Sequence, residues 1–214
     1  MKTKKIFISI AVIAVVAVLT VGMALAYMTD RERKVNTFTV GDLDITLSEP
    51  DWNDQEDGNE MVPGYETKKN PTVKAIHGSS YMRVTVEFVS TDSSGMTAAR
   101  VEKIMQTICC RGATGVNTEN FTLDGVRSTD TKYVYNYNGI FEEGSEVILF
   151  DAVKIPTAWN QTDISVLGSY KLVIRAEAIQ SSGFDSAEDA YKALDGEIAA
   201  GTAQENYKTV NGGV

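Results

Sequence analysis

One histidine, His77, limits the chemistry that this sequence can support, because it is the single imidazole in the chain. A serine or cysteine nucleophile needs a neighbouring base, and a tetrahedral zinc site needs several suitably spaced ligands. The sequence contains no HExxH, no GxSxG and no cysteine pair at metal-binding spacing. His77 precedes the run Gly78-Ser79-Ser80, which is typical of a turn. We therefore expect a surface histidine and predict no catalytic residue, metal site or cofactor; a zinc site of His77 and carboxylates is the alternative.

Carboxylates are abundant, and the densest run of them lies between Glu49 and Gly64. Counted from Asp51 as the first ligand, Asn53 and Gln55 fall at the spacing of a calcium-binding loop. The sixth position is Glu56, however, and the glycine that this loop requires arrives two places late. We interpret the run as a solvated acidic loop, and weak, irregular cation binding is the alternative.

The two cysteines, Cys109 and Cys110, are neighbours in the sequence. A disulfide between neighbours requires a distorted peptide unit, so the usual bridge geometry is not easily reached. Free cysteine is common in protein cores. We expect two unpaired residues at the end of a helix, one of them buried; a vicinal disulfide and an intermolecular bridge are the alternatives.

Three tyrosines, Tyr133, Tyr135 and Tyr137, alternate along one candidate strand and would share one of its faces. Such a stripe could bind carbohydrate. Strand aromatics are usually half buried, however, and Phe141 and Phe150 follow nearby. We therefore favour core packing for these rings, and a glycan-binding face is the alternative.

The N-terminal segment has the features of an export signal. Three lysines precede an almost unbroken apolar run from Ile6 to Leu19, and Ala24 and Ala26 supply the small-x-small pattern of signal peptidases. We predict cleavage between Ala26 and Tyr27, which leaves 188 of the 214 residues. The alternative is an uncleaved anchor helix, since the apolar segment is about long enough to span a bilayer.

The charge of the exported part is strongly negative. Without the three lysines of the signal, 17 Lys and Arg remain against 29 Asp and Glu, a net charge of −12. Nucleic acids and anionic lipids require a positive surface. We therefore expect neither as a partner, and we expect membrane contact only through an uncleaved signal segment.

Alternating hydrophobicity predicts two long strands, from Tyr81 to Val89 and from Ser169 to Ile179. Ahead of them, Leu43, Ile45 and Leu47 share one strand face and are expected in the core. Phe38 and Val40 fall at even positions, whereas these three residues fall at odd ones. The two sets would therefore point to opposite faces of one regular strand, and we predict a bulge at Gly41 that shifts the alternation. Shorter strands are expected near 72–76, 132–136 and 147–150.

Two segments change to helical spacing. Apolar residues at i, i+3, i+4 and i+7 predict a helix from Thr97 to Cys109, and a second helix opens at Asp185 with Glu188 in a capping arrangement. Short strands with few helices are typical of an antiparallel sandwich. The fold class is therefore mainly β: an antiparallel β-sandwich with two helical insertions, preceded by an N-terminal signal helix.

Several segments taken together carry a family resemblance. The most specific are Ala-Tyr-Met-Thr-Asp at the signal junction and the strand-like VNTFTVGDLDITL that follows it. The others are EPDW (49–52), PG (63–64), KNPTV (69–73), YMRV (81–84), IRAEAIQ (174–180) and GFDSAEDA (183–190). The chain thereby resembles the TasA/camelysin family of secreted proteins of Gram-positive bacteria, whose export depends on a SipW-type signal peptidase.

The resemblance implies a jelly-roll-like sandwich and, for TasA itself, extracellular fibres in the biofilm matrix. Such fibres assemble when the N-terminal strand of one subunit completes the sheet of the next, by strand addition. The candidate donor here is the segment from Tyr27 to Phe38, with Tyr27, Met28, Val35 and Phe38 as its apolar residues. Camelysin, the other branch, is a metallopeptidase.

The sequence thus predicts a signal peptide (1–26), an N-terminal arm (27–37) and one β-sandwich domain (38–214). We expect a secreted, non-enzymatic structural protein of the cell surface or biofilm matrix of a Gram-positive bacterium. Its expected partners are the SipW-type signal peptidase and either further copies of itself or a related fibre protein. A camelysin-like secreted metallopeptidase and a monomeric surface adhesin or glycan-binding protein are the alternatives.

Overall fold

The computed structural model describes residues 43–52, 61–200 and 208–213, the last segment by its backbone. All of them belong to the unit that spans residues 40–214. Several sequence predictions concern residues outside the described ranges: the signal helix, the bulge at Gly41, and the cleavage and donor-strand residues Ala24, Ala26, Tyr27, Met28, Val35 and Phe38.

The largest sheet consists of β4 (Ser80–Ser90), β7 (Phe121–Leu123), β8 (Lys132–Tyr137), β11 (Tyr170–Gln180) and β12 (Lys208–Gly213). Its strand order is β12-β11-β4-β8-β7, and all neighbouring strands are antiparallel. β4 and β11 pair along their entire lengths of eleven residues. These are the two long strands that the alternating pattern predicts.

Two smaller sheets are also antiparallel. One contains β1 (Asp44–Ser48), β3 (Thr72–His77) and β9 (Glu146–Ile148) in the order β1-β3-β9. The other contains β2 (Glu66–Lys68), β5 (Ile108–Cys110), β6 (Ala113–Thr114) and β10 (Ala152–Lys154) in the order β2-β10-β5-β6.

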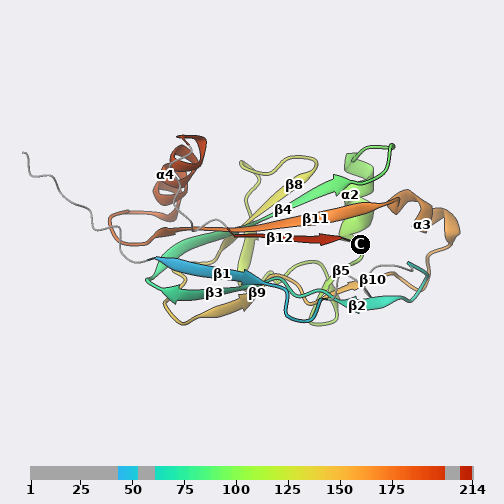
Figure 1. Ribbon diagram of the computed structural model, residues 1–214, viewed down its shortest axis with the longest axis horizontal. Coiled ribbons are helices and arrows are strands. Elements are labelled where there is room, and N and C mark those ends of the chain that lie inside the picture. The colour runs from blue at the N-terminus through green and yellow to red at the C-terminus, as the bar shows by residue number, and fades with distance from the viewer. Residues whose placement is uncertain (1–42, 53–60, 201–207, 214) are drawn as a thin grey trace, which may run out of the picture. The chain divides into compact units, whose positions relative to one another are not determined.

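The five-stranded sheet faces the two smaller sheets across one hydrophobic core (Figure 1). Val86 of β4 and Leu172 of β11 enter this core from one side, and Ile45 of β1 and Val153 of β10 enter it from the other. Each of these side chains is at most 1% exposed. The predicted fold class, a mainly β antiparallel sandwich, is confirmed.

β1 carries the predicted core face. Ile45 is fully buried, and Leu43 and Leu47 are partly buried and pack against the core. The pairing of β1 with β3 shifts register between Asp44 and Ile45. A strand irregularity therefore exists in this part of the chain, within β1 itself.

Three helices lie within the described ranges: α2 (Ala98–Met105), α3 (Gln161–Leu167) and α4 (Ala187–Ala200). α3 adds to the two helices that the sequence predicts, and it begins with a capping box in which Asn160 and Asp163 exchange hydrogen bonds. α4 begins later than predicted, because the hydroxyl of Ser186, rather than Asp185, accepts a hydrogen bond from Asp189 N.

The predicted helix from Thr97 to Cys109 is too long. α2 starts as expected, with the Thr97 hydroxyl accepting from Arg100 N, but it ends at Met105. Ile108 and Cys109 instead pair with Val153 and Ala152 of β10. Ile108 has the spacing of a helical apolar stripe, but a buried apolar residue fits a strand equally well. Its pairing with β10 places it in a strand.

Both cysteines are therefore in strand β5, not at a helix end. Each is buried and neither forms a disulfide. Successive side chains of an extended strand point to opposite faces. This geometry keeps the two sulfur atoms apart and fits the expected unpaired thiols rather than a vicinal disulfide.

The tyrosine stripe of β8 faces the core. Tyr135 is buried, and Tyr133 and Tyr137 pack against the hydrophobic core. Edge-to-face contacts join Tyr133 to Phe88 and Tyr137 to Phe141. The prediction of core packing is confirmed for these rings. The alternative prediction, a glycan-binding face made by this stripe, is wrong because the rings point into the core.

Candidate functional site

The predicted surface histidine lies where the sequence places it. His77 is the exposed last residue of β3, and Gly78 follows with a φ of 72° in the turn to β4. Within the described ranges, no group of three or more His, Cys, Asp or Glu side chains is arranged to hold a metal ion. In the same part of the chain, no helix combines the length and apolar character needed to cross a membrane.

Two of the segments that carry the family resemblance meet in space. The buried ammonium of Lys69 lies 3.0 Å from Glu49 Oε1 and 4.0 Å from the centre of the Trp52 ring. Asp51 and Asn70 exchange two hydrogen bonds of 3.1 and 3.2 Å. EPDW and KNPTV thus hold each other in place where the chain leaves β1.

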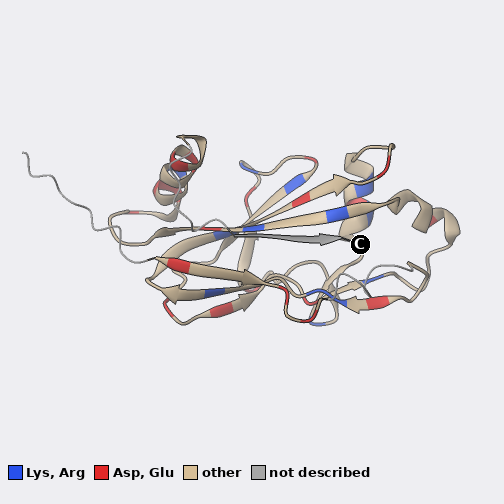
Figure 2. Ribbon diagram, in the orientation of Figure 1, with Lys and Arg blue, Asp and Glu red and all other residues tan. Residues whose placement is uncertain are grey.

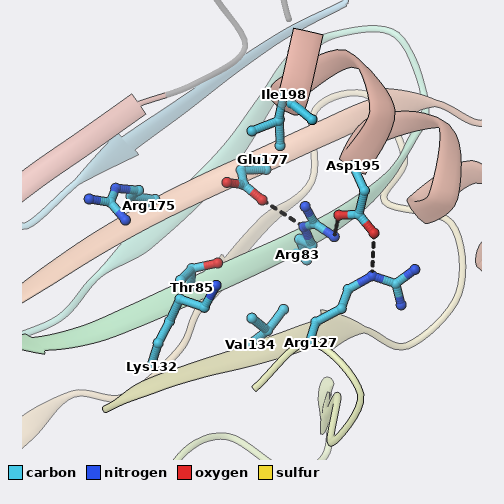
Figure 3. A pocket seen from close by; sticks show the side chains of 10 residues that line it. Arg83, Thr85, Arg127, Lys132, Val134, Arg175, Glu177, Asp195 and Ile198 are labelled. Carbon is cyan, nitrogen blue, oxygen red and sulfur yellow. Dashed lines mark hydrogen bonds and ion pairs between the residues drawn. The ribbon is translucent and has the colours of Figure 1, made fainter. Parts of the chain in front are cut away.

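A groove of about 440 Å³ lies between the end of α4 and the outer face of the five-stranded sheet (Figure 3). Strand register aligns its floor: Arg175 of β11 lies opposite Thr85 of β4, which lies opposite Val134 of β8. Ile198 of α4 forms part of the wall. Three strands and one helix therefore contribute to a single site.

The inner end of the groove is a network of ion pairs (Figure 3). Arg83 Nε lies 2.6 Å from Glu177 Oε2, and Arg83 Nη1 lies 2.7 Å from Asp195 Oδ1. The second oxygen of Asp195 lies 2.7 Å from Arg127 Nε. Asp195 of α4 thus bridges two arginines of the sheet and its loops. Arg127 also pairs with Asp124 at 2.9 Å.

The protonation of this network follows from its contacts. Burial opposes the charge of Asp195, but hydrogen bonds from Arg127 and Arg83 outweigh burial and lower the pKa of the carboxyl. Hydrogen bonding to Glu188, partly opposed by burial, raises the pKa of Arg127. The bridging carboxylate and Arg127 are both charged at neutral pH.

Apolar contacts and charge together fix α4 on the sheet. Ala190, Tyr191 and Leu194 form a small buried cluster with Ile179 of β11, and the Tyr191 hydroxyl donates to Met82 O at 3.0 Å. Figure 2 marks several acidic positions along α4, and two of its residues, Glu188 and Asp195, pair with Arg127. The last two turns of α4 line one side of the groove through Asp195, Ile198 and Ala199.

The outer end of the groove carries two further cations. Arg175 Nη1 lies 2.7 Å from Glu87 Oε2. Lys132 is directly opposite Glu87 in the strand register, but its ammonium forms no ion pair or hydrogen bond within the described ranges. Lys132 is thus a cation that faces the groove without a partner in that part of the chain.

Sequence reasoning missed this groove. The alternating pattern assigns Arg83 and Arg175 to the polar faces of their strands, which is correct. The strand order and register bring these arginines close to Lys132. The position of α4 on the sheet then determines which part of that face is covered. The available signal was a set of basic residues on one strand face of an otherwise acidic chain.

A smaller cleft of about 210 Å³ lies beside β5 and β9 and is lined by Cys110, Arg111, Asn117 and Asp151, among others. Asp151 accepts a 2.8 Å hydrogen bond from Arg111 N, and Arg111 has a positive φ of 52°. Asn117 donates to Ile148 O at 3.0 Å. The side chains of Asp151 and Asn117 thus form hydrogen bonds with the backbone that surrounds the cleft.

Comparison with known proteins identifies no family. No family model matches the chain, and no curated protein sequence is similar to it. Among solved structures, it is similar to a type III cohesin module from the cellulosomal ScaE cell-surface anchoring scaffoldin of Ruminococcus flavefaciens, with 11% identity over 69% of this chain and 71% of that chain. The TM-score of 0.27 is too low to indicate a common fold.

Proposed function

We propose that this chain is a secreted, non-enzymatic structural protein of the cell surface or biofilm matrix of a Gram-positive bacterium, a TasA-like fibre subunit or accessory. The observation that carries the proposal is the position of β1. Among the described strands, β1 pairs with β3 alone, so it is an edge of its sheet. In the sequence, residues 38–43 separate the N-terminal arm from this edge strand.

That arrangement supports the proposal of assembly by strand addition. An exposed sheet edge has free backbone groups that can pair with an extended segment of another chain. The donor segment from Tyr27 to Phe38 has apolar residues at both ends and the charged run TDRERK between them. Charged side chains are costly to bury. We therefore infer that the apolar ends bind in the acceptor and that the charged run stays in solvent.

Release of the donor segment requires removal of the signal. A SipW-type signal peptidase cleaving between Ala26 and Tyr27 would free the arm for assembly. The secreted protein should therefore begin at Tyr27, which intact-mass analysis can determine. Replacing Ala26 by a large charged residue should block cleavage and leave full-length precursor with the cells. A secreted form that begins elsewhere would contradict this cleavage site.

The test of the function is electron microscopy of the mature chain. We expect filaments from protein that begins at Tyr27, and none from a variant lacking Tyr27 to Val35. A variant whose arm has the same composition in shuffled order is the matched control, because it preserves length and charge. It should also fail to polymerise. Monomers at all concentrations in analytical ultracentrifugation would refute the proposal.

A further inference from the structure

We propose that the last strand, β12, occupies the acceptor edge for strand addition, and that the N-terminal arm of a second copy displaces it. This inference rests on the proposed function, because it takes the segment from Tyr27 to Phe38 as the donor. It names the edge that accepts the donor: the edge of β11, next to β1. A single chain is then capped by its own last strand, and assembly is an exchange of strands.

β11 requires a neighbour on the side away from β4. Its inner face belongs to the core, where Leu172, Ile174 and Ala176 are completely buried. β4 pairs with one edge of β11 along all eleven residues, and β12 pairs with the other edge. A long uncovered edge would offer its backbone groups to other chains. β12 therefore protects the edge of the longest pair of strands.

This protection is incomplete. β12 pairs with six of the eleven residues of β11, and the pairing stops at Ala176. Among the described strands, Glu177, Ala178 and Ile179 of β11 pair with β4 alone. An extended segment of another chain can form its first backbone hydrogen bonds there. It can then replace β12 one residue pair at a time, so that the edge stays covered throughout the exchange.

The sequence of β12 is poorly suited to a strand. It reads KTVNGG, and glycine weakens a strand because it has no side chain to pack. The donor segment ends with VNTF (35–38), whereas β12 contains VNGG (210–213). The arm thus repeats Val-Asn and has Thr37 and Phe38 in place of the two glycines. Threonine and phenylalanine are favoured in strands, and this difference favours the donor over β12.

The position of β12 also fits a fibre contact. β1 lies beside β12 where the two layers of the sandwich meet (Figure 1). The arm precedes β1 in the sequence, and the acceptor edge belongs to β11, so donor and acceptor are different parts of the chain. A contact between unlike surfaces of two copies is heterologous and can continue into an open filament.

A reversible disulfide between β11 and β12 tests the exchange. Val173 and Asn211 lie opposite each other in the strand register, so Val173→Cys with Asn211→Cys places two cysteines within bridging distance. Intact-mass analysis establishes the bridge. The oxidised variant, beginning at Tyr27, should stay monomeric, and the same sample should form filaments after reduction. Using one sample in two redox states excludes a folding defect as the cause.

A matched pair of cysteines controls for the bridge itself. Lys74 of β3 and Glu146 of β9 are also opposite each other, and both are exposed. Lys74→Cys with Glu146→Cys links two strands of another sheet. This variant should form filaments in both redox states.

A labelled peptide of residues 27–38 measures the exchange without polymerisation. Its acceptor is the chain that lacks Tyr27 to Val35 and carries the β11–β12 cysteine pair. The reduced acceptor should bind the peptide at least about tenfold more tightly than the oxidised acceptor, as fluorescence anisotropy can determine. A peptide with Thr37→Gly and Phe38→Gly, which restores the VNGG of β12, should bind about tenfold more weakly than the natural peptide.

The outcomes separate this inference from the proposed function. Filaments from the oxidised β11–β12 variant, or equal peptide affinity of its two redox states, would overturn the displacement of β12 and leave strand addition at another edge. No filaments from the unmodified mature chain, together with no peptide binding, would overturn both.

Discussion

The ammonium of Lys69 lies 3.0 Å and 3.1 Å from the two carboxylate oxygens of Glu49, and both side chains are almost completely buried. Trp52 covers the ammonium with its ring at 4.0 Å. This pair joins the segment after β1 to the segment between β2 and β3. It therefore fixes the path of the chain immediately after the strand that follows the N-terminal arm.

Breaking this pair should be costly. Lys69→Met leaves the Glu49 carboxylate buried without its cation, and we expect the free energy of unfolding to fall by about 3–5 kcal/mol. Denaturant unfolding measures the change. The double variant Lys69→Met, Glu49→Gln should recover much of it, because no charge then remains buried. Lys68→Met, at the exposed neighbour, is the control and should change stability by less than about 0.5 kcal/mol.

Stability should fall in acid through Asp92. A hydrogen bond from the Ser94 hydroxyl, followed by one from Ser169 N, lowers the pKa of Asp92. A carboxyl with a lowered folded-state pKa stabilises the fold above its unfolded-state pKa of about 3.9, and this contribution disappears as the pH falls toward the folded-state value. Urea midpoints measured from neutral pH downward should fall less steeply for Asp92→Asn. The exposed Asp130→Asn should follow the unmodified protein, and identical slopes for both variants would contradict this role.

Gly168 should tolerate no side chain. Its φ is 58°, and a Cβ atom there would collide with the Arg100 guanidinium and the Asp92 carboxylate. Gly168→Ala should therefore lower the thermal midpoint through both backbone strain and collision. The strain alone should lower the free energy of unfolding by about 1–3 kcal/mol. Gly144→Ala isolates the strain, since Gly144 has a φ of 79° with open space around it. Equal decreases of the thermal midpoint in the two variants would show that the Arg100 and Asp92 side chains move aside without a cost in stability.

Asp195→Asn should loosen α4. The change removes the bridge between Arg83 and Arg127, and because Asp195 is 43% exposed we expect a modest loss of about 1 kcal/mol. Hydrogen exchange should accelerate in α4 and not in β4 or β11. Lys192→Gln, which removes only exposed pairs of 3.8 and 3.9 Å on the same helix, should leave exchange unchanged. Unchanged exchange in Asp195→Asn would show that apolar contacts alone hold the helix.

Local pattern predicted the strands best where apolar and polar residues alternate. Along β4 and β11, the apolar residues of the core face alternate with residues that are mostly polar, so periodicity locates both strands even though several of the polar residues are also buried. The pattern failed at Ile108, which fits the apolar stripe of α2 but pairs with β10. It also gave no sign of α3, whose seven residues bury only Ile164 and Leu167.

The candidate groove required information that no single segment contains. Arg83, Lys132 and Arg175 come from three strands, and their positions become neighbours only through the order β11-β4-β8 and its register. The two contacts of Asp195 depend in addition on α4 docking against this sheet. The site therefore depends on which strands and which helix lie side by side, and residue types alone do not specify this.

The opposed side chains of β5 have a consequence for redox chemistry. Burial, the largest influence, raises the pKa of both the Cys109 and the Cys110 thiols, so the reactive thiolate form is scarce at neutral pH. Both cysteines are largely buried, with 7% and 9% of their surface exposed, although Cys110 lines the cleft beside β5 and β9. Both thiols should therefore react slowly with oxidants, and the opposite directions of their side chains disfavour a disulfide between them.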